Sequence, residues 1–247
     1  MFGITKKRKS FREEKIIGII GTINSEINKI KNFLNIISEE KHIGLKFYIA
    51  KYKNLDIVLV EAGIGKVNVA SCTQILIDKF NICQLINTGV AGALKDNINI
   101  CDIIIVDEVT YHDVRKARMQ NSFPYKESFI SDRKLLEIAV EGCDDKNFKI
   151  YDYHIGKCVT GEAFISDNEF KEIILADHDS KCVDMEGAAI AHVCDINNVP
   201  FIAIKSISDK ADENANKTYE KFENIATNNS SKLLLNMLNI INEYNYI

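Results

Sequence analysis

Two apolar runs of this chain end in acidic and hydroxyl side chains. One run, residues 200–205, continues into a Ser-Ile-Ser-Asp stretch that ends at Asp209, and another passes from Val183 into Asp184 and Glu186. Short apolar runs bounded by polar turn residues are typical of buried strands. Because the carboxyl ends of strands in an α/β sheet open onto the ligand crevice, carboxylates at two such ends can face one small molecule. The pattern therefore predicts an α/β protein with a small-molecule site.

The rest of the chain alternates between strand-like and helix-like segments. Strands are predicted at residues 16–21, 45–50, 55–61, 84–87, 103–109, 151–160 and 201–207. Helices are predicted at residues 67–80, 133–140, 168–174, 186–195 and 219–244, with a further helix near the N-terminus. Such alternation, with some short strands in antiparallel order, predicts a three-layer α/β/α sandwich around a mixed central β-sheet.

The first helix is predicted from its cap and its apolar spacing. Asn24 or Ser25 can cap it, and Ile27, Ile30, Leu34 and Ile37 recur at helical spacing. A continuous helix through residue 37 is therefore expected.

Length and composition indicate one compact domain. The chain has 247 residues, 46% of them apolar, and only two prolines, and no linker interrupts it. We expect residues 1–14 to be a solvated extension and residues 15–247 to form a single domain. The formal net charge is −4. Since no basic stripe recurs and no apolar stretch approaches the roughly 18–20 residues that span a bilayer, neither nucleic acid nor membrane is an expected partner.

Cysteines and histidines give no metal or disulfide pattern. The seven cysteines are scattered singly, without CxxC spacing, and an odd total does not suit a disulfide framework. Reduced thiols in a cytoplasmic protein are the plain interpretation. The histidines never pair at HxH or HExxH spacing, so no metal and no other cofactor is expected. His112, at a strand end, is a possible pocket residue.

Several short motifs occur in a characteristic order. They lie at residues 17–21 with Glu26, 63–67, 86–92, 107–113, 161–165, 184–194 and 206–212. In this order the chain resembles the nucleoside phosphorylase/hydrolase family and, within it, the 5′-methylthioadenosine/S-adenosylhomocysteine nucleosidases. The resemblance covers about residues 16 to 225 and implies a nucleoside phosphorylase-like fold. It also implies hydrolysis of an adenine nucleoside at its N-glycosidic bond.

Two carboxylates suit that chemistry, because the purine must leave without negative charge and the ribose acquires oxocarbenium character. The resemblance implies that Asp209 protonates adenine N7, that Ser208 orients Asp209, and that Glu26 activates the attacking water. From the residues alone other interpretations stay open. The Ser-Ile-Ser-Asp stretch also suits a helix cap, and a glutamate in a first helical turn suits the helix dipole.

The resemblance also implies a set of substrate contacts. Glu186 would bind the ribose hydroxyls, since a carboxylate can accept two hydrogen bonds from a vicinal diol. Met185 would lie against the sugar, Phe164 would stack on adenine, and Ile165 would read the purine edge through its backbone. Ile64 and Tyr219 would border the 5′ substituent.

The chain departs from the family pattern at several positions. Val90 and Lys205, which would border the attacking water and the ribose, stand where the family often has Ser and Arg, and Asp184 stands where Glu is more frequent. Lysine keeps the charge of arginine but loses its planar fork. Residues 114–126 lack a glycine-rich stretch that is usual in the family, so the 5′ substituent is not defined by the sequence.

Three other functions remain open at this point. They are phosphorolysis by a family relative, hydrolysis of a futalosine-type nucleoside, and nucleoside binding without catalysis. Phosphorolysis needs groups that hold a phosphate dianion, usually arginine, and no arginine lies in a glycine-rich phosphate loop. The resemblance further implies a homodimer in which a loop of one subunit completes the 5′ pocket of the other, and residues 114–124 are the candidates for that contact.

Overall fold

The computed structural model describes residues 15–144, 151–244 and 246. Its strands are β1 (Ile16–Gly21), β2 (Asn35–His42), β3 (Leu45–Tyr52), β4 (Leu55–Glu61), β5 (Ile82–Ala93), β6 (Ile103–Tyr111), β7 (Ser128–Ile130), β8 (Tyr153–Thr160), β9 (Cys182–Asp184) and β10 (Phe201–Asp209). Its helices are α1 (Asn24–Lys31), α2 (Lys66–Phe80), α3 (Lys116–Gln120), α4 (Arg133–Asp144), α5 (Asn168–His178), α6 (Gly187–Ile196) and α7 (Ala215–Tyr244). The expected extension, residues 1–14, lies outside the described residues.

The strands form one mixed sheet of ten strands, in the order β10-β6-β8-β9-β5-β1-β4-β3-β2 with β7 beside β6. β1 runs parallel to β4 and β5, whereas β3 runs antiparallel to β2 and β4. β10 also pairs with β5, so the strands β5, β10, β6, β8 and β9 close into a ring. The predicted mixed sheet is confirmed.

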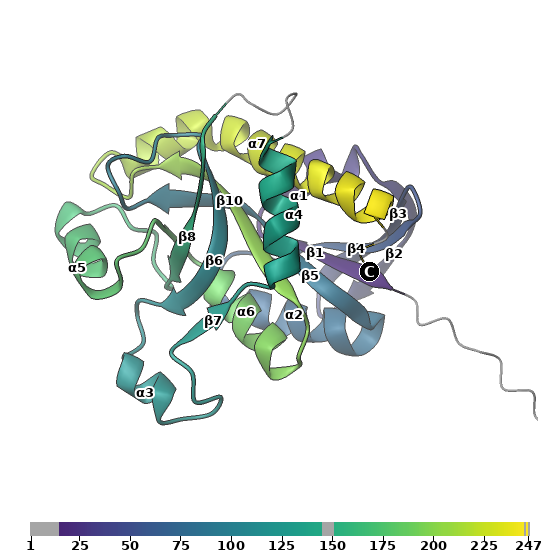
Figure 1. Ribbon diagram of the computed structural model, residues 1–247, viewed down its shortest axis with the longest axis horizontal. Helices are drawn as coiled ribbons and strands as arrows, with labels where there is room; N and C mark the ends of the chain where they lie inside the picture. Colours follow the sequence, from purple (N-terminus) through teal and green to yellow (C-terminus); the bar gives the residue numbers. More distant parts are fainter. Residues whose placement is uncertain (1–14, 145–150, 245, 247) are drawn as a thin grey trace, which may run out of the picture.

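Helices cover both faces of the sheet (Figure 1), which confirms the predicted three layers. α2 and α6 pack on one face, where Val69, Leu76 and Ile190 join sheet residues in a buried apolar cluster. α1, α4 and α7 pack on the other face through residues such as Ile27 and Leu234. Successive strand residues point to opposite faces of a sheet, and for this reason both faces need apolar side chains.

The first helix is shorter than predicted. α1 ends at Lys31, and the residues expected to continue it form a turn and then strand β2. β2 pairs antiparallel with β3, and Ile37 is 57% exposed rather than part of a buried helical stripe. Strand pairing with a neighbour of strong β character has overridden a helical spacing that rested on few residues.

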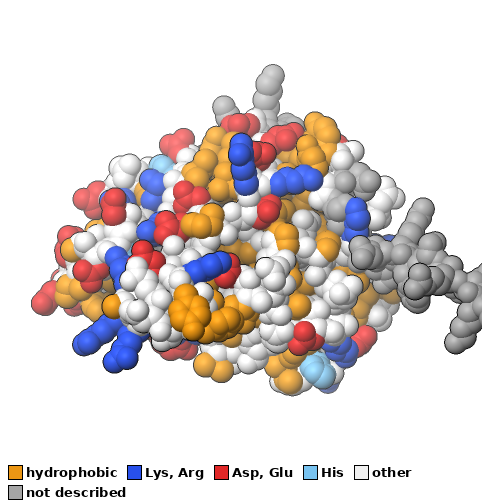
Figure 2. Space-filling model, turned by 60° about the horizontal axis from the view of Figure 1, so that its bottom comes forward, with side chains coloured by type: hydrophobic (Ala, Val, Ile, Leu, Met, Phe, Trp, Pro, Cys, Tyr) orange, Lys and Arg blue, Asp and Glu red, His pale blue; other side chains and the backbone are white. Residues whose placement is uncertain are grey.

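The structure also shows the state of the cysteines, the character of the helices and the distribution of charge on one face. All seven cysteines lie among the described residues; none is bonded to another, and only Cys83 is not fully buried. None of the described helices combines the length and the apolar character needed to cross a membrane. On the face drawn in Figure 2, acidic, basic and apolar side chains are intermixed, without a continuous basic area among the residues described there.

Candidate active site

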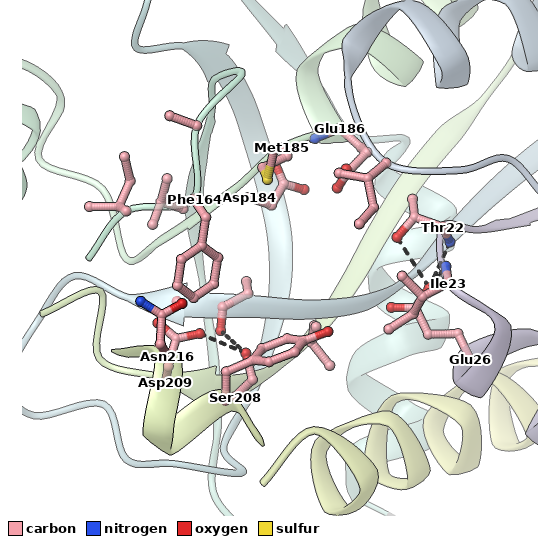
Figure 3. A pocket seen from close by; sticks show the side chains of 18 residues that line it. Thr22, Ile23, Glu26, Phe164, Asp184, Met185, Glu186, Ser208, Asp209 and Asn216 are labelled. Atoms are coloured by element: carbon pink, nitrogen blue, oxygen red, sulfur yellow. Dashed lines mark hydrogen bonds between the residues drawn. The ribbon is translucent and has the colours of Figure 1, made fainter. Parts of the chain in front are cut away.

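Several of the predicted site residues meet at the carboxyl ends of three neighbouring parallel strands, β1, β5 and β10. β5 lies between β1 and β10, with Ile20 opposite Asn87 and Asp209 opposite Gly92. At these ends lies a cavity of about 390 Å³, a volume within the usual range for small-molecule sites (Figure 3). It is lined by Thr22, Ile23, Glu26, Ile64, Val90, Ala91, Gly92, Ala163, Phe164, Ile165, Val183, Asp184, Met185, Glu186, Ser208, Asp209, Asn216 and Tyr219.

Asp209 is the last residue of β10 and is 2% exposed. Its Oδ1 accepts the N–H of Ala211 at 2.8 Å, and its Oδ2 accepts the hydroxyl of Ser208 at 2.8 Å. Burial raises the pKa of Asp209, although these two bonds act in the opposite direction. A raised pKa favours the protonated carboxyl, which is the form that can donate a proton.

Glu26, in the first turn of α1, is 1% exposed. Its Oε2 accepts the backbone N–H groups of Thr22 at 2.7 Å and Ile23 at 3.3 Å. Burial raises the pKa of Glu26, whereas the charge of Lys205 and these N–H groups favour the anion. The hydrogen bonds thus fix the carboxylate in place and favour its ionised form, which is the form that can accept a proton.

The absence of a side chain at residue 89 makes room for Glu26. A Cβ at Gly89 would lie 2.5 Å from Glu26 Oε1, closer than real Cβ contacts. Gly89 faces Lys205 across the β5–β10 pairing, and Val90 is the next residue of β5. The glycine in this motif therefore allows a strand to approach a buried carboxylate closely.

Glu186 precedes α6 and lies on a third side of the cavity, facing the space between Asp209 and Glu26 (Figure 3). Its Oε1 accepts the N–H of Gly65 at 2.9 Å. Burial, reinforced by the nearby charge of Asp184, raises the pKa of Glu186 to about 7. The carboxylate and the acid are thus both populated near neutral pH.

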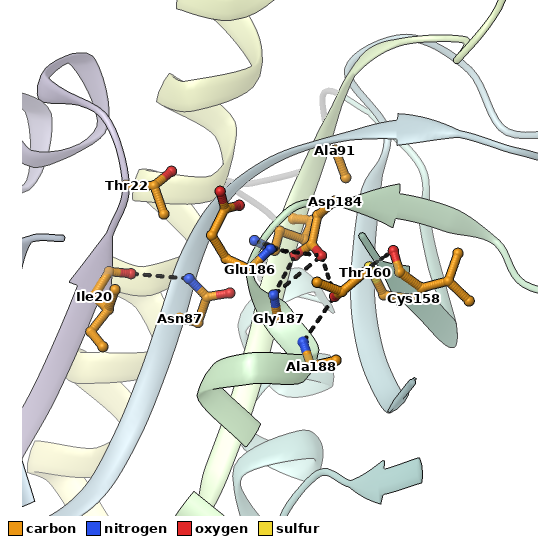
Figure 4. Close-up of polar contacts among 12 residues, drawn as sticks. Ile20, Thr22, Asn87, Ala91, Cys158, Thr160, Asp184, Glu186, Gly187 and Ala188 are labelled. Atoms are coloured by element: carbon orange, nitrogen blue, oxygen red, sulfur yellow. Dashed lines mark hydrogen bonds and ion pairs between the residues drawn. The ribbon is translucent and has the colours of Figure 1, made fainter. Parts of the chain in front are cut away.

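Asp184 organises the chain around Glu186 (Figure 4). Its Oδ1 accepts the hydroxyl of Thr160 at 2.6 Å, and its carboxylate accepts the N–H of Gly187 at 3.0 Å from Oδ2. Thr160 in turn accepts the N–H of Ala188 at 2.9 Å. These bonds satisfy backbone groups at the start of α6, and so they hold Glu186 at the rim of the cavity.

Lys205 does not line the cavity with the other predicted site residues. Its side chain lies under the cavity, where Nζ is 2.9 Å from Asp184 Oδ2. Burial opposes its charge, yet Asp184 and Glu186 outweigh this effect and raise the pKa of Lys205 above its ordinary value. Lys205 therefore remains an ammonium ion, and its charge lowers the pKa of Glu26.

The apolar residues predicted from the family pattern line the cavity. Phe164 is 40% exposed and meets Tyr219 edge to face, with ring centroids 5.9 Å apart. Ile165 is buried beside it. Met185, Ile64 and Val90 complete this set. The cavity thus joins an aromatic, apolar part to a part rich in carboxylates.

Sequence reasoning missed some of the residues that line the cavity. Thr22, Ile23 and Asn216 line the cavity, but none belongs to a polar run at a strand end. Only their places in the chain could have indicated these residues. Thr22 and Ile23 directly follow β1, and Asn216 lies at the start of α7 beside Asp209 (Figure 3). His112, a possible pocket residue, does not line the cavity and instead contacts Phe170 edge to face.

Among the described residues, no group of three or more His, Cys, Asp or Glu side chains is arranged to hold a metal ion. The carboxyl groups of the described site are suited to acid–base chemistry. An acid favoured in its protonated form and a carboxylate rich in donors face one cavity.

Comparison with known proteins places the chain in a family. A family model described as "Phosphorylase superfamily" matches residues 16–239. The chain belongs to this superfamily. Among curated relatives, the 5′-methylthioadenosine/S-adenosylhomocysteine nucleosidase of Buchnera aphidicola subsp. Schizaphis graminum is 39% identical over 236 residues, which cover 94% of this chain and 99% of the relative. The nucleosidase of the same description from Exiguobacterium is 35% identical, over 89% of this chain and 95% of the relative.

Solved structures of superfamily members have the same fold. The 5′-methylthioadenosine/S-adenosylhomocysteine nucleosidase of Neisseria meningitidis, in complex with methylthio-immucillin-A, matches with a TM-score of 0.86 and 30% identity, over 91% of this chain and 98% of that one. Futalosine hydrolase of Helicobacter pylori matches with a TM-score of 0.85 and 28% identity, over 92% of this chain and 98% of that one. Solved structures of hydrolases for two classes of nucleoside therefore share the fold of this chain.

Proposed function

We propose that this protein hydrolyses the N-glycosidic bond of 5′-methylthioadenosine and S-adenosylhomocysteine, releasing adenine and the 5′-thio-substituted ribose. The observation that supports this most is the meeting of two buried carboxyl groups, Asp209 and Glu26, in one cavity with an aromatic wall. The named relatives that align over most of the chain are nucleosidases of this kind.

In the proposed mechanism Asp209 is the acid. Its carboxyl lies near Phe164, on which adenine stacks, and donates a proton to N7, so that the base leaves as a neutral molecule. Ser208, bonded to Oδ2, fixes the orientation of the carboxyl group. Burial supports the role because it favours the protonated form at the start of the reaction.

Glu26 is the base in this mechanism. It takes a proton from a water molecule that attacks the anomeric carbon as adenine departs. The N–H groups of Thr22 and Ile23 hold its carboxylate, and Lys205 stabilises its negative charge. Glu186 accepts hydrogen bonds from the ribose hydroxyls, and Ile64 and Tyr219 border the 5′ group.

A phosphorylase reaction is disfavoured by the composition of the site. Of the arginines in the described part of the chain, Arg115, Arg118 and Arg133, none lines the cavity. The cavity instead carries the carboxylates of Glu26, Asp184 and Glu186, which would repel a phosphate dianion. Futalosine-type hydrolysis is the second candidate, favoured by the similarity to the Helicobacter pylori enzyme.

The test is to incubate the purified protein with 5′-methylthioadenosine, S-adenosylhomocysteine, futalosine and inosine, each with and without phosphate. We expect adenine from the first two substrates at equal rates in both buffers, with free methylthioribose as the sugar product. Methylthioribose 1-phosphate, or a strict need for phosphate, would assign the protein to the phosphorylases. Turnover of futalosine alone would establish the second candidate.

We further propose that the protein acts as a cytoplasmic homodimer in the salvage of methionine. Exposed apolar side chains around α3 and β7 support the dimer: Phe123, Tyr125 and Ile130 are each about 70% exposed. The segment that carries them overlaps residues 114–124, the predicted contact with a partner's 5′ pocket. A fully active monomer in light scattering would rule out this assembly.

A further inference from the structure

Three loops beside the cavity are joined by a cluster of charged groups that the proposed mechanism does not use. The cluster consists of Lys66 at the start of α2, Asp113 after β6 and Glu162 after β8. Lys66 Nζ lies 2.6 Å from Asp113 Oδ2 and 3.9 Å from Glu162 Oε2. The three residues come from segments that are far apart in the sequence.

Backbone hydrogen bonds turn these ion pairs into a closed ring. Asp113 Oδ2 also accepts the N–H of Glu162 at 3.0 Å, and Glu162 Oε2 accepts the N–H of Lys66 at 3.2 Å. Two links of this ring therefore involve a main-chain N–H, and the third joins the side chains of Lys66 and Asp113. An exposed ion pair alone adds little to stability, but a carboxylate that accepts backbone N–H groups also fixes the course of the chain.

The ring is one residue away from a group that holds Glu186. Gly65, which precedes Lys66, donates its N–H to Glu186 Oε1 at 2.9 Å. Gly65 has a φ of +101°, and a Cβ there would lie 2.7 Å from Glu162 Oε1. The carboxylate of Glu162 thus packs directly on the backbone of Gly65, in space that only glycine leaves open.

The same ring borders the opposite part of the cavity. Phe164 and Ile165 follow Glu162 in the same loop, and Ile64 precedes Gly65. The side chains of Lys66 and Asp113 are only 23% and 28% exposed, and Lys66 Nζ lies 5.4 Å from the centroid of the Tyr111 ring. Partial shielding from water keeps such pairs from being fully screened.

We propose that Lys66 is a positioning residue of the nucleoside pocket. Through Asp113 and Glu162 its ammonium holds the Gly65 N–H against Glu186 and, at the same time, holds the loop that carries Phe164. The sugar part and the base part of the pocket are thereby set relative to each other by one charge. This inference rests on the proposed function, because it assigns the pocket to a nucleoside.

The test compares Lys66→Met, Lys66→Arg and a matched control, Lys51→Met. Lys51 pairs with Asp56 at 2.7 Å in an exposed position, at the end of the strands away from the cavity, and neither residue lines the cavity. For Lys66→Met we expect KM for 5′-methylthioadenosine to rise about tenfold while kcat stays within about threefold of wild type. Lys66→Arg, which keeps the charge, should restore KM to within about threefold, and Lys51→Met should leave both constants unchanged.

A double-mutant cycle with Asp113→Asn tests the ring itself. Both residues act through one contact. The double variant Lys66→Met with Asp113→Asn should therefore have a KM no higher than that of the more impaired single variant. An unchanged KM in Lys66→Met, a fall in kcat alone, or additive losses in the cycle would overturn the inference.

Calorimetry with adenine separates this inference from the proposed function. If wild-type protein released no adenine from 5′-methylthioadenosine, the proposed function would fail, whereas adenine binding would still report on the loop of Phe164. We expect adenine to bind Lys66→Met about fivefold more weakly than wild type and Lys51→Met equally well. Equal affinity for all three proteins would overturn the role of Lys66 whatever the outcome of the activity assay.

Discussion

The ammonium of Lys205 lies 2.9 Å from Asp184 Oδ2, and the two side chains are only 2% and 1% exposed. Both residues depart from the pattern of the family that the chain resembles, and each keeps the sign of the charge that is more usual there. Asp184 also holds Thr160 and Gly187. The pair therefore connects the buried charge under the cavity to the start of α6.

Removing the cation of this buried ion pair should destabilise the protein. Lys205→Met leaves the Asp184 carboxylate buried without its cation, and we expect a loss of about 3–5 kcal/mol in the free energy of unfolding. Adding Asp184→Asn should recover part of that loss, because the second change removes the unpaired charge. Urea unfolding at neutral pH measures both effects. The control is Lys79→Met, whose pair with Glu40 at 2.6 Å is exposed and should contribute less than about 1 kcal/mol. Equal losses in Lys205→Met and Lys79→Met would contradict the prediction.

Asp209→Asn should lose turnover but gain stability. The amide keeps the shape of the side chain but cannot donate the proton that neutralises adenine. Burial raises the pKa of Asp209, so the folded protein binds this proton more tightly than the unfolded chain. Above the ordinary pKa of 3.8 that difference disfavours the folded state, and the amide removes it.

Calorimetric melting and adenine release measure the two effects of Asp209→Asn. The melting temperature should rise by a few degrees at neutral pH, and the gain should disappear below about pH 4. Glu213→Gln, on an exposed residue outside the cavity, is the control. Normal adenine release by Asp209→Asn would remove this residue from the mechanism.

Glu26→Gln should abolish hydrolysis while adenine still binds. The amide cannot take a proton from water, and Glu26 lies with Thr22 and Ile23 at the end of the cavity opposite Phe164 (Figure 3). Equilibrium binding of adenine together with a turnover assay distinguishes a lost base from a lost pocket. If adenine binding were lost in parallel with hydrolysis, Glu26 would be a structural residue rather than the base.

The affinity for substrate should depend on pH through Glu186. The raised pKa of about 7 means that the carboxylate dominates above pH 7 and the protonated acid below it. Because the proposed role of the Glu186 carboxylate is to accept hydrogen bonds from the ribose hydroxyls, we expect KM to rise as the pH falls through 7. Initial rates across this range measure the effect, and Glu186→Gln should show a high KM without this pH dependence. A pH-dependent KM that persists in Glu186→Gln would assign the titration to another group.

Val90→Ser tests the consequence of the missing hydroxyl next to Glu26. Val90 lines the cavity, and its backbone lies close enough to the Glu26 carboxylate to lower the pKa of that group. A hydroxyl at this position can orient the attacking water, so kcat should rise by about twofold to tenfold. Val90→Ala is the matched control, because it removes the same volume without adding a hydroxyl. Equal rates for the two variants would show that water placement does not depend on residue 90.

The fold was largely predictable because its strong signals are local. Apolar runs that end in polar residues, such as the run that ends at Asp209, mark the buried strands and also the edge where the site lies. The strand β2 was missed because Leu34 and Ile37 recur at helical spacing, although its partner β3 follows directly after a two-residue turn at Ile43 and Gly44. Local periodicity does not report such pairing.

The site was predictable to the extent that family motifs carry it. Glu26 on its own is a glutamate in a first helical turn, and only the motif before it suggests a base. The position of Lys205 beneath the cavity, rather than in its wall, depends on strand register and on the pairing with Asp184, neither of which a single sequence displays. Asn216 enters the cavity through the packing of α7, and no polar run announces it.

The position of β2 at the end of the strand order has a consequence for the behaviour of the protein at high concentration. Its unpaired side offers main-chain donors and acceptors to which a strand of another molecule could bond. Ser38, Glu39, Glu40 and Lys41 occupy that strand and are all exposed. Charges placed along an open strand disfavour edge-to-edge pairing, because a second copy would bring like charges together and strip them of water. The stretch that was expected to continue a helix is thus an edge strand whose charges disfavour growth of the sheet.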